Sequence, residues 1–245
     1  MFDARIRAEN LREIVEVLST LVDEVKVSIN KDEISTKAVD PAHVAMVDLV
    51  VSKKAFEKFK GDEMELGLHL DKLKSILKLT RSGDEISMHY DEDKNRLIVQ
   101  VGNITRTMAL VDTAGMSEPK VPKLSLPSSM TVKVSELVQG IRAAESISDH
   151  IALHMTPEGF QMNSEGETDS TSLKIPKESL EELKTKESVR SLFPLDYFTN
   201  MVKAASSADT VSMWLGTDFP VKIEFSLAGG HGHVRYLLAP RIETE

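Results

Sequence analysis

The sequence predicts an α+β protein made of two tandem copies of one fold, with helices on one side of antiparallel sheets. The first observation is a long internal repeat: apolar residues 11–34 match apolar residues 126 positions later, and residues 70–88 match residues 125 positions later. The second is that strand-like alternation and helix-like periodicity follow the same order in both halves. The third is an aperiodic segment that separates the halves. A period this long leaves each copy large enough for a core of its own.

The first half begins with the alternation Phe2 to Ala8, which predicts a strand. Asn10 is expected to cap a helix whose apolar positions keep the 3.6-residue period up to Leu21. Asp71 is expected to cap a second helix, which ends at Arg81. The remaining elements are a short helix near 53–59 and strands at 24–30, 33–39, 44–51, 63–68, 85–90, 96–101 and 104–111.

The second half repeats this order. Asp196 stands at the repeat position of Asp71 and is again expected to cap a helix. The expected helices are 135–147, a short one near 177–183, and 196–206. The expected strands are 130–134, 150–156, 159–164, 171–175, 188–193, 210–216, 220–227 and 232–238.

Residues 113–128 contain three prolines and no hydrophobic period, which is typical of an extended linker. We therefore predict an N-terminal domain at 1–115, a connecting loop at 116–127 and a C-terminal domain at 128–245.

The composition narrows the class of protein. With no cysteine among 245 residues, disulfides and thiolate chemistry are absent, which fits a reducing cytoplasm. We expect no leader peptide and no membrane span, because the apolar runs are short. The formal net charge of −9 argues at first against nucleic acid. The position of the positive charge counts for more than the sum, however.

Positive charge is concentrated on one expected helix. Residues 71–81 carry Lys72, Lys74, Lys78 and Arg81 against the single acid Asp71. Such side chains can simply solvate an exposed helix face. Lys78 and Lys203 occupy equivalent positions of the repeat, which favours a shared role.

Two expected strands, 104–111 and 170–175, have the pattern of unpaired sheet edges. Pairing one edge with the other edge of a second copy gives a heterologous contact, which closes into a ring if the rotation suits. The alternative is that both edges are short and polar enough to stay open.

The histidines do not predict a metal site. His150 and His154 lie on an expected strand, His231 and His233 flank Gly232 in a turn, and no third ligand stands at metal spacing. The sequence contains no nucleophile elbow, phosphate loop or paired-carboxylate motif. We expect no cofactor and no catalysis. The rival hypothesis is a hydrolase or metalloprotein that uses Asp40, His43 and the histidine-rich turn.

Several motifs resemble the sliding clamp family known as proliferating cell nuclear antigen, most closely its archaeal members. They cover essentially the whole chain, and the C-terminal string is the most specific. They are Met1-Phe2-x-Ala4-Arg5, Ala38-Val39-Asp40-Pro41-Ala42-His43-Val44, Leu70-x-x-Leu73-x-x-Ile76-Leu77-Lys78, Ser148-Asp149-His150, Glu165-Gly166-Glu167 and Tyr236-Leu237-Leu238-Ala239-Pro240-Arg241-Ile242-Glu243.

The resemblance implies a non-catalytic, head-to-tail homotrimeric ring around duplex DNA, located in the cytoplasm with the nucleoid. It implies that a clamp loader, DNA polymerase, flap endonuclease and ligase bind through short glutamine-plus-aromatic motifs. The residues implied to contact DNA are Arg12, Lys72, Lys74, Lys78, Arg81, Arg142 and Lys203. Those of the partner groove are Val39, His43, Val44, Met46, Leu124, Leu126, Pro220, Leu237, Leu238, Ala239 and Pro240.

The implied subunit contact uses Thr105, Thr107, Met108, Leu110, Thr171, Leu173 and Ile175. Two alternatives stay open at this point. The ring could share its contacts with paralogues, and the protein could be a scaffold that binds no DNA.

Overall fold

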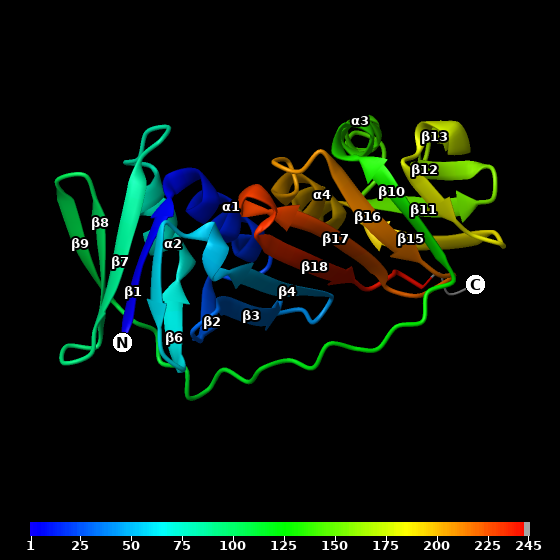
Figure 1. Cartoon of the computed structure of the whole chain (residues 1–245). Helices are drawn as coiled ribbons and strands as arrows, with labels where there is room; N and C mark the ends of the chain where they lie inside the picture. The colour runs from blue at the N-terminus through cyan, green and yellow to red at the C-terminus, as the bar shows by residue number, and fades with distance from the viewer. Residues whose placement is uncertain (243–245) are drawn as a thin grey trace. The chain divides into compact units, whose positions relative to one another are not determined.

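The computed structural model describes residues 1–242, so Glu243 of the C-terminal motif lies outside the described residues. The chain forms two compact units. The first contains Met1–Val121 and Ser226–Val234, and the second contains Pro122–Phe225 and the chain from Arg235 onwards. Each unit combines antiparallel sheets with two α-helices, which confirms the predicted α+β class (Figure 1).

The first unit contains two antiparallel sheets. One has the strand order β5-β1-β7-β8-β9, with bounds Lys58–Gly61, Phe2–Arg7, Glu85–Asp91, Arg96–Val101 and Ile104–Ala109. The other is the run β4-β3-β2-β6 at one end of a longer sheet, with bounds Ala45–Ser52, Glu33–Val39, Glu24–Ile29 and Met64–His69. Helices α1 (Ala8–Ser19) and α2 (Leu70–Leu77) pack together and bury an apolar face each.

The second unit repeats this plan. One run of paired strands has the order β14-β10-β16-β17-β18, with bounds Glu182–Lys184, Ser128–Lys133, Thr210–Leu215, Val221–Leu227 and Gly232–Leu238. The last residues of β17 and the first of β18 fall within Ser226–Val234, which belongs to the first unit. The other run has the order β13-β12-β11-β15, with bounds Ser170–Pro176, Gly159–Glu165, His150–Thr156 and Val189–Pro194. Its helices are α3 (Val134–Ala144) and α4 (Leu195–Ala204). Both strand orders match those of the first unit element by element, so the repeat in the sequence is a repeat of topology.

Each unit also contains an isolated β-bridge to an edge strand, at equivalent positions. Val111 forms an isolated bridge with Gly67 on β6, and Arg241 forms one with Leu192 on β15, the repeat counterpart of Gly67. The Val111 N–H donates to the Gly67 carbonyl at 2.9 Å, and the Arg241 N–H donates to the Leu192 carbonyl at 2.7 Å. A Cβ on Gly67 would stand 2.1 Å from the Val111 carbonyl oxygen, so the first bridge requires glycine.

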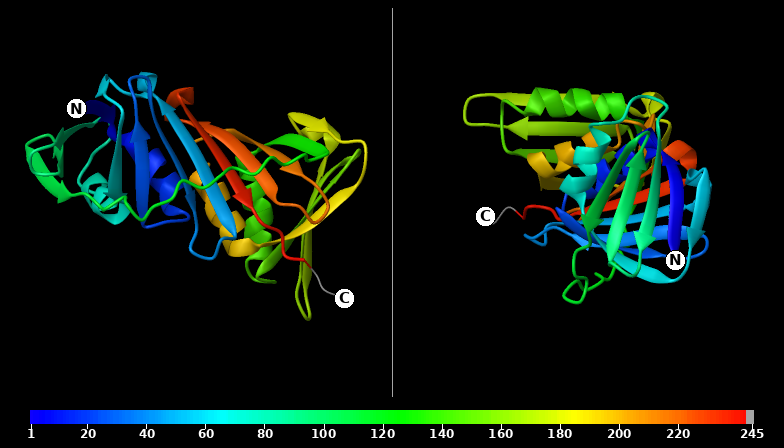
Figure 2. Two further views of the ribbon diagram at one scale, coloured as in Figure 1. Left: turned by 90° about the horizontal axis from the view of Figure 1, so that it is seen from below. Right: turned by 90° about the vertical axis from the view of Figure 1, so that its left-hand side faces the viewer.

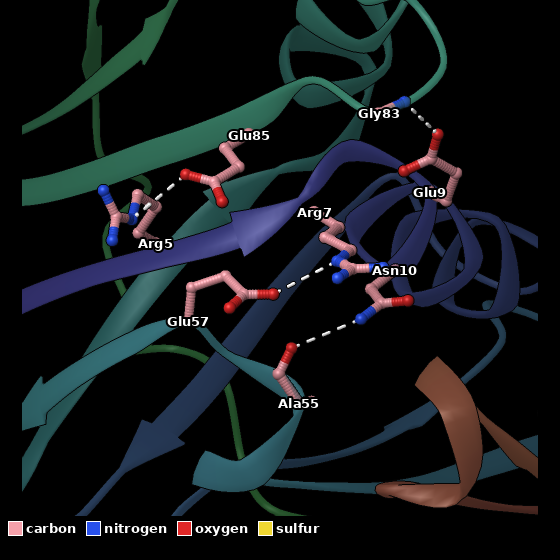
Figure 3. Close-up of polar contacts among 8 residues, drawn as sticks. All are labelled: Arg5, Arg7, Glu9, Asn10, Ala55, Glu57, Gly83 and Glu85. Carbon is pink, nitrogen blue, oxygen red and sulfur yellow. Dashed lines mark hydrogen bonds and ion pairs between the residues drawn. The ribbon is translucent and has the colours of Figure 1, made fainter.

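The predicted helix caps are wrong. The N-cap residues are Arg7, His69 and Pro194, and none of their side chains caps the helix. Asn10 lies inside α1 and donates from Nδ2 to the Ala55 carbonyl at 3.3 Å (Figure 3). Asp71 and Asp196 are each the second residue of their helix, where a carboxylate still interacts favourably with the helix dipole.

The reason is that every α-helix follows a strand directly, so no loop residue is available to cap it. The first N–H of each helix instead donates to the backbone carbonyl of an aspartate. Ala8 donates to Asp84 at 2.8 Å and Leu70 to Asp23 at 2.9 Å. Their repeat counterparts Val134 and Leu195 donate to Asp209 and Asp149 at 3.0 and 2.8 Å. These aspartates match across the repeat, and their backbone carbonyl groups accept the first N–H of each helix.

The prediction of two short helices is wrong as well, because each of these segments forms one 3₁₀ turn followed by a strand. The turns are Lys53–Ala55 and Lys177–Ser179, and β5 and β14 follow them. Pairing of these short strands with β1 and β10 overrides local helix preference. The predicted helix 71–81 ends at Leu77, so Arg81 lies in the turn before β7. Residues 112–127 contain no helix or strand (Figure 2).

Candidate nucleic-acid and partner interfaces

Helix α2 carries the most accessible positive charge of the first unit. It buries Leu70, Leu73, Ile76 and Leu77, which leaves the lysines on its outer side. Lys72 and Lys78 are exposed, and no ion pair involves either of them within residues 1–242. Lys74 Nζ lies 3.3 Å from Asp71 Oδ1, so part of its charge is compensated. Arg81 is exposed in the following turn.

Arg12 of α1 is used inside the unit. Its Nη2 donates to Thr80 Oγ1 at 2.8 Å and to the Leu77 carbonyl at 3.2 Å, which ties α1 to the end of α2. The rest of the outer side of α1 is acidic. Helix α1 therefore presents no net positive face.

Two of these acidic side chains also make backbone contacts. Glu9 accepts the Gly83 N–H at 2.7 Å (Figure 3), and this hydrogen bond lowers the pKa of the Glu9 carboxyl. Glu13 accepts the Ala228 N–H at 2.7 Å. The acidic residues of α1 are thus part of the fold of the first unit.

On the helices of the second unit the positive charge is sparse. Arg142 is exposed on α3. Lys203 of α4 lies with its Nζ 3.6 Å from Glu145 Oε1, at the end of α3. Both partners of this pair are well exposed, so the interaction is weak. Lys203 can exchange Glu145 for another anion.

The structure places both predicted edge segments at sheet margins. Strand β9 ends the order β5-β1-β7-β8-β9, and β13 ends the order β13-β12-β11-β15. Each therefore has one row of backbone N–H and C=O groups without a strand partner in its own sheet. On β9 the outward side includes Ile104, a large apolar side chain that is 49% exposed.

The predicted contact residues differ in burial. Thr105 and Thr107 are exposed, Leu110, Thr171 and Leu173 are half-buried, and Met108 and Ile175 are buried in their own unit. Met108 and Ile175 can thus contribute only backbone groups to a contact between subunits. Arg106, which the sequence does not single out, donates from Nη1 to Ser75 Oγ at 2.9 Å.

The predicted groove residues of the first unit surround one rigid turn. Asp40 is 3% exposed, and its carboxylate accepts N–H groups of Ala42, Val44 and Ala45 at 3.0, 2.8 and 2.7 Å. His43 is exposed with a positive φ of 57°. Val39 and Val44 are half-buried, whereas Met46 is buried. The Asp40 carboxylate is engaged in holding this turn, which argues against the rival catalytic role.

The predicted groove residues of the second unit are partly accessible. Leu124, Leu126, Pro220, Ala239 and Pro240 are half-buried, whereas Leu237 and Leu238 are buried. Sequence reasoning missed Phe219, which precedes Pro220 in the turn before β17 and is 53% exposed. The sequence signal that could have identified Phe219 is an aromatic residue in an expected turn between two strands.

The start of the connecting loop is attached to the first unit. Lys37 on β3 forms an ion pair with Glu118. The hydrogen bond from Lys37 lowers the pKa of the Glu118 carboxyl, and the same bond raises the pKa of the Lys37 ammonium. Both groups are accessible to solvent, so the pair orients the loop more than it stabilises the fold.

The histidines make local contacts. His154 Nε2 lies 2.6 Å from Ser188 Oγ, and His150 Nε2 lies 2.6 Å from Arg241 Nη1. Within residues 1–242, no group of three or more His, Cys, Asp or Glu side chains could hold a metal ion. No helix in that range is both long and apolar enough to cross a membrane.

Comparison with known proteins gives a consistent result. The family model of the N-terminal domain of proliferating cell nuclear antigen matches residues 1–113, and that of the C-terminal domain matches residues 120–241. The DNA polymerase sliding clamps of Methanocella arvoryzae and Methanococcoides burtonii are 43% and 41% identical over 246 aligned residues. Both alignments cover 100% of this chain and 100% of the relative.

Solved structures agree. A structure of the C-terminal region of FEN-1 bound to A. fulgidus PCNA matches with a TM-score of 0.93 and 33% identity, covering 100% of both chains. The structure of PCNA from Thermococcus kodakaraensis matches with a TM-score of 0.91 and 26% identity, covering 98% of this chain and 100% of that one.

Proposed function

The chain belongs to the proliferating cell nuclear antigen family and is a sliding clamp for DNA polymerase, and we propose that it works as a closed ring of three identical subunits around duplex DNA. The observation that carries this proposal is the pair of edge strands β9 and β13, one in each unit, which both have an unpaired side. Joining β9 of one subunit to β13 of the next gives a heterologous contact that can repeat until the ring closes.

DNA is held by enclosure and by a modest number of phosphate contacts. The exposed Lys72 and Lys78 on α2 are the principal contacts, and Lys74, Arg81, Arg142 and Lys203 add to them. Arg12 contributes least, because its guanidinium is engaged with Leu77 and Thr80. Contacts to phosphate are independent of base sequence, so a few of them permit sliding.

Partner proteins dock on apolar residues near the connecting loop. In the second unit these are Leu124, Leu126, Pro220, Ala239 and Pro240, with Leu237 and Leu238 beneath, and in the first unit Val39, His43, Val44 and Met46. A short helical turn with a glutamine and paired aromatic residues is the ligand that fits such a surface. The relative bound to FEN-1 supports a flap endonuclease as one partner. We add the clamp loader, DNA polymerase and ligase.

The clamp itself performs no catalysis and requires no cofactor in this proposal. It acts in the cytoplasm, associated with the nucleoid. The placement of the domains at 1–115 and 128–245, with a connecting loop at 116–127, is part of the same proposal.

The decisive experiment compares two double variants in a primer-extension assay on circular DNA with a clamp-dependent polymerase. Lys78→Ala with Lys203→Ala removes one positive charge from α2 and one from α4, and we expect a several-fold loss of stimulation that grows with salt. Lys60→Ala with Lys177→Ala removes the same charge from exposed sites outside the helices and should leave stimulation unchanged. Equal activity of both variants would favour a scaffold that does not hold DNA.

A further inference from the structure

The core of the first unit contains a void of about 60 Å³. Its walls come from α1, α2 and the strands of both sheets, including Val15, Leu18, Val27, Leu49, Leu66 and Leu73. Most of these side chains are buried, but Ile14, Ile34, Phe56 and Leu68 are half-buried, so the void lies in the core and is not fully enclosed. Native cores rarely leave a space larger than one water molecule, and a void of this size therefore needs a cause.

The void offers nothing to a water molecule. Thr36 is the one hydroxyl-bearing residue of the lining, and its Oγ1 already donates to the Lys26 carbonyl at 2.7 Å. All other lining side chains are hydrocarbon or thioether. A buried water needs two to four polar partners, so this space stays dry.

The repeat explains why the space exists. Three lining positions, Ile34, Leu68 and Leu73, correspond in the second unit to Phe160, Phe193 and Phe198. All three phenylalanines are at most 1% exposed. The two units share one strand order, but the first builds its core without these three rings. The lining also contains Phe2 and Phe56 where the second unit has Ser128 and Leu180, so the aromatic volume is placed differently and the positions of Ile34, Leu68 and Leu73 are left without a ring.

We propose that this void is a binding site for a small apolar molecule, of the size of a xenon atom or a hydrocarbon of two or three carbons. Its volume is well below the roughly 150 Å³ of cavities that hold benzene, which sets the upper size. A guest would restore dispersion contacts that the wall atoms lack. No polar guest has a partner there. We expect no equivalent site in the second unit, because its three rings occupy the corresponding positions.

The test uses the full-length protein with carbon-13-labelled methyl groups, observed by NMR under increasing xenon pressure. We expect saturable shifts of methyl signals from lining residues such as Val27 and Val51. Their repeat counterparts Leu153 and Ile175 should not shift. These pairs are matched controls within one molecule, because both members are buried at equivalent positions.

Two reciprocal substitutions complete the test. Leu73→Phe should abolish the shifts of Val27 and Val51, and Phe198→Leu should make Leu153 and Ile175 responsive to xenon. Circular dichroism checks that each variant is folded, and Ile34→Phe replaces Leu73→Phe if that variant unfolds. The proposal is overturned if saturating xenon leaves the lining methyls unshifted, if both units of the natural protein respond alike, or if the shifts persist in a folded filled variant.

Discussion

Arg12 shows at the scale of a single residue why a basic side chain on a helix need not be a phosphate ligand. Its guanidinium reaches two acceptors at the end of α2, Thr80 Oγ1 and the Leu77 carbonyl. Lys78 stands one residue beyond Leu77 and is exposed. Arg12 and Lys78, both expected to contact DNA, thus have different structural roles.

This difference gives a prediction. Arg12→Ala should lower the free energy of unfolding by about 1–2 kcal/mol, because charge-assisted hydrogen bonds between α1 and α2 are lost. Lys78→Ala should change it by less than about 0.5 kcal/mol, as expected for an exposed side chain. Urea denaturation followed by circular dichroism measures both values. Equal effects of the two substitutions would contradict the assigned role of Arg12.

At the scale of an element, the connecting loop is oriented by one ion pair. Lys37 on β3 holds Glu118, and the loop beyond it contains no helix or strand. A single accessible contact can open easily when a partner binds, since exposed ion pairs contribute little to stability.

The Lys37–Glu118 contact predicts a pH dependence. The pKa of Glu118 lies below its ordinary value of 4.5 because the carboxylate accepts a hydrogen bond from Lys37. A lowered pKa in the folded state means that the contact is fully formed above pH 4.5 and is lost as the pH falls through that lower value. Loop attachment should therefore persist at neutral pH and fail only in acid.

Lys37→Ala should return the titration midpoint of Glu118 toward 4.5, as followed by carbon-13 NMR of its carboxyl group. Lys120→Ala, which removes a nearby charge from the loop itself, should leave the midpoint low. A midpoint that does not move in Lys37→Ala would show that another group lowers this pKa.

At the scale of the whole molecule, the two units repeat one topology, and β9 and β13 each end a sheet with one side open. Open edges promote uncontrolled association unless a specific partner covers them. A repeated β9-to-β13 contact would cover the open sides of these two strands in every subunit. The acidic net charge of −9 is compatible with this arrangement, because α2 and the residue after it present the exposed Lys72 and Lys78.

The corresponding prediction concerns the oligomeric state. Light scattering of the natural protein should give a mass near three protomers, and Leu173→Asp should give one protomer, because a carboxylate would be desolvated in the contact. Leu183→Asp is the matched control, since Leu183 is a half-buried leucine on the edge strand β14 outside the proposed contact. A trimer that survives Leu173→Asp would disprove the edge assignment.

The sequence by itself determined the repeat, most of the strands and the α+β class, because these depend on local periodicity; it placed helices where β5 and β14 lie. The strand expected at 33–39 is found at Glu33–Val39 for this reason. Local patterns also located the open edges and the basic helix. Motif resemblance identified the family, which the family models confirm.

Only the tertiary structure decided how the helices begin, which cations are engaged and where the core is incomplete. The Ala8 N–H finds its acceptor at Asp84 and Arg12 finds its acceptor at Thr80, each far along the chain. The void near Leu73 depends on the summed volume of side chains from two helices and several strands. Such contacts depend on distances in space, and no local pattern in the sequence records them.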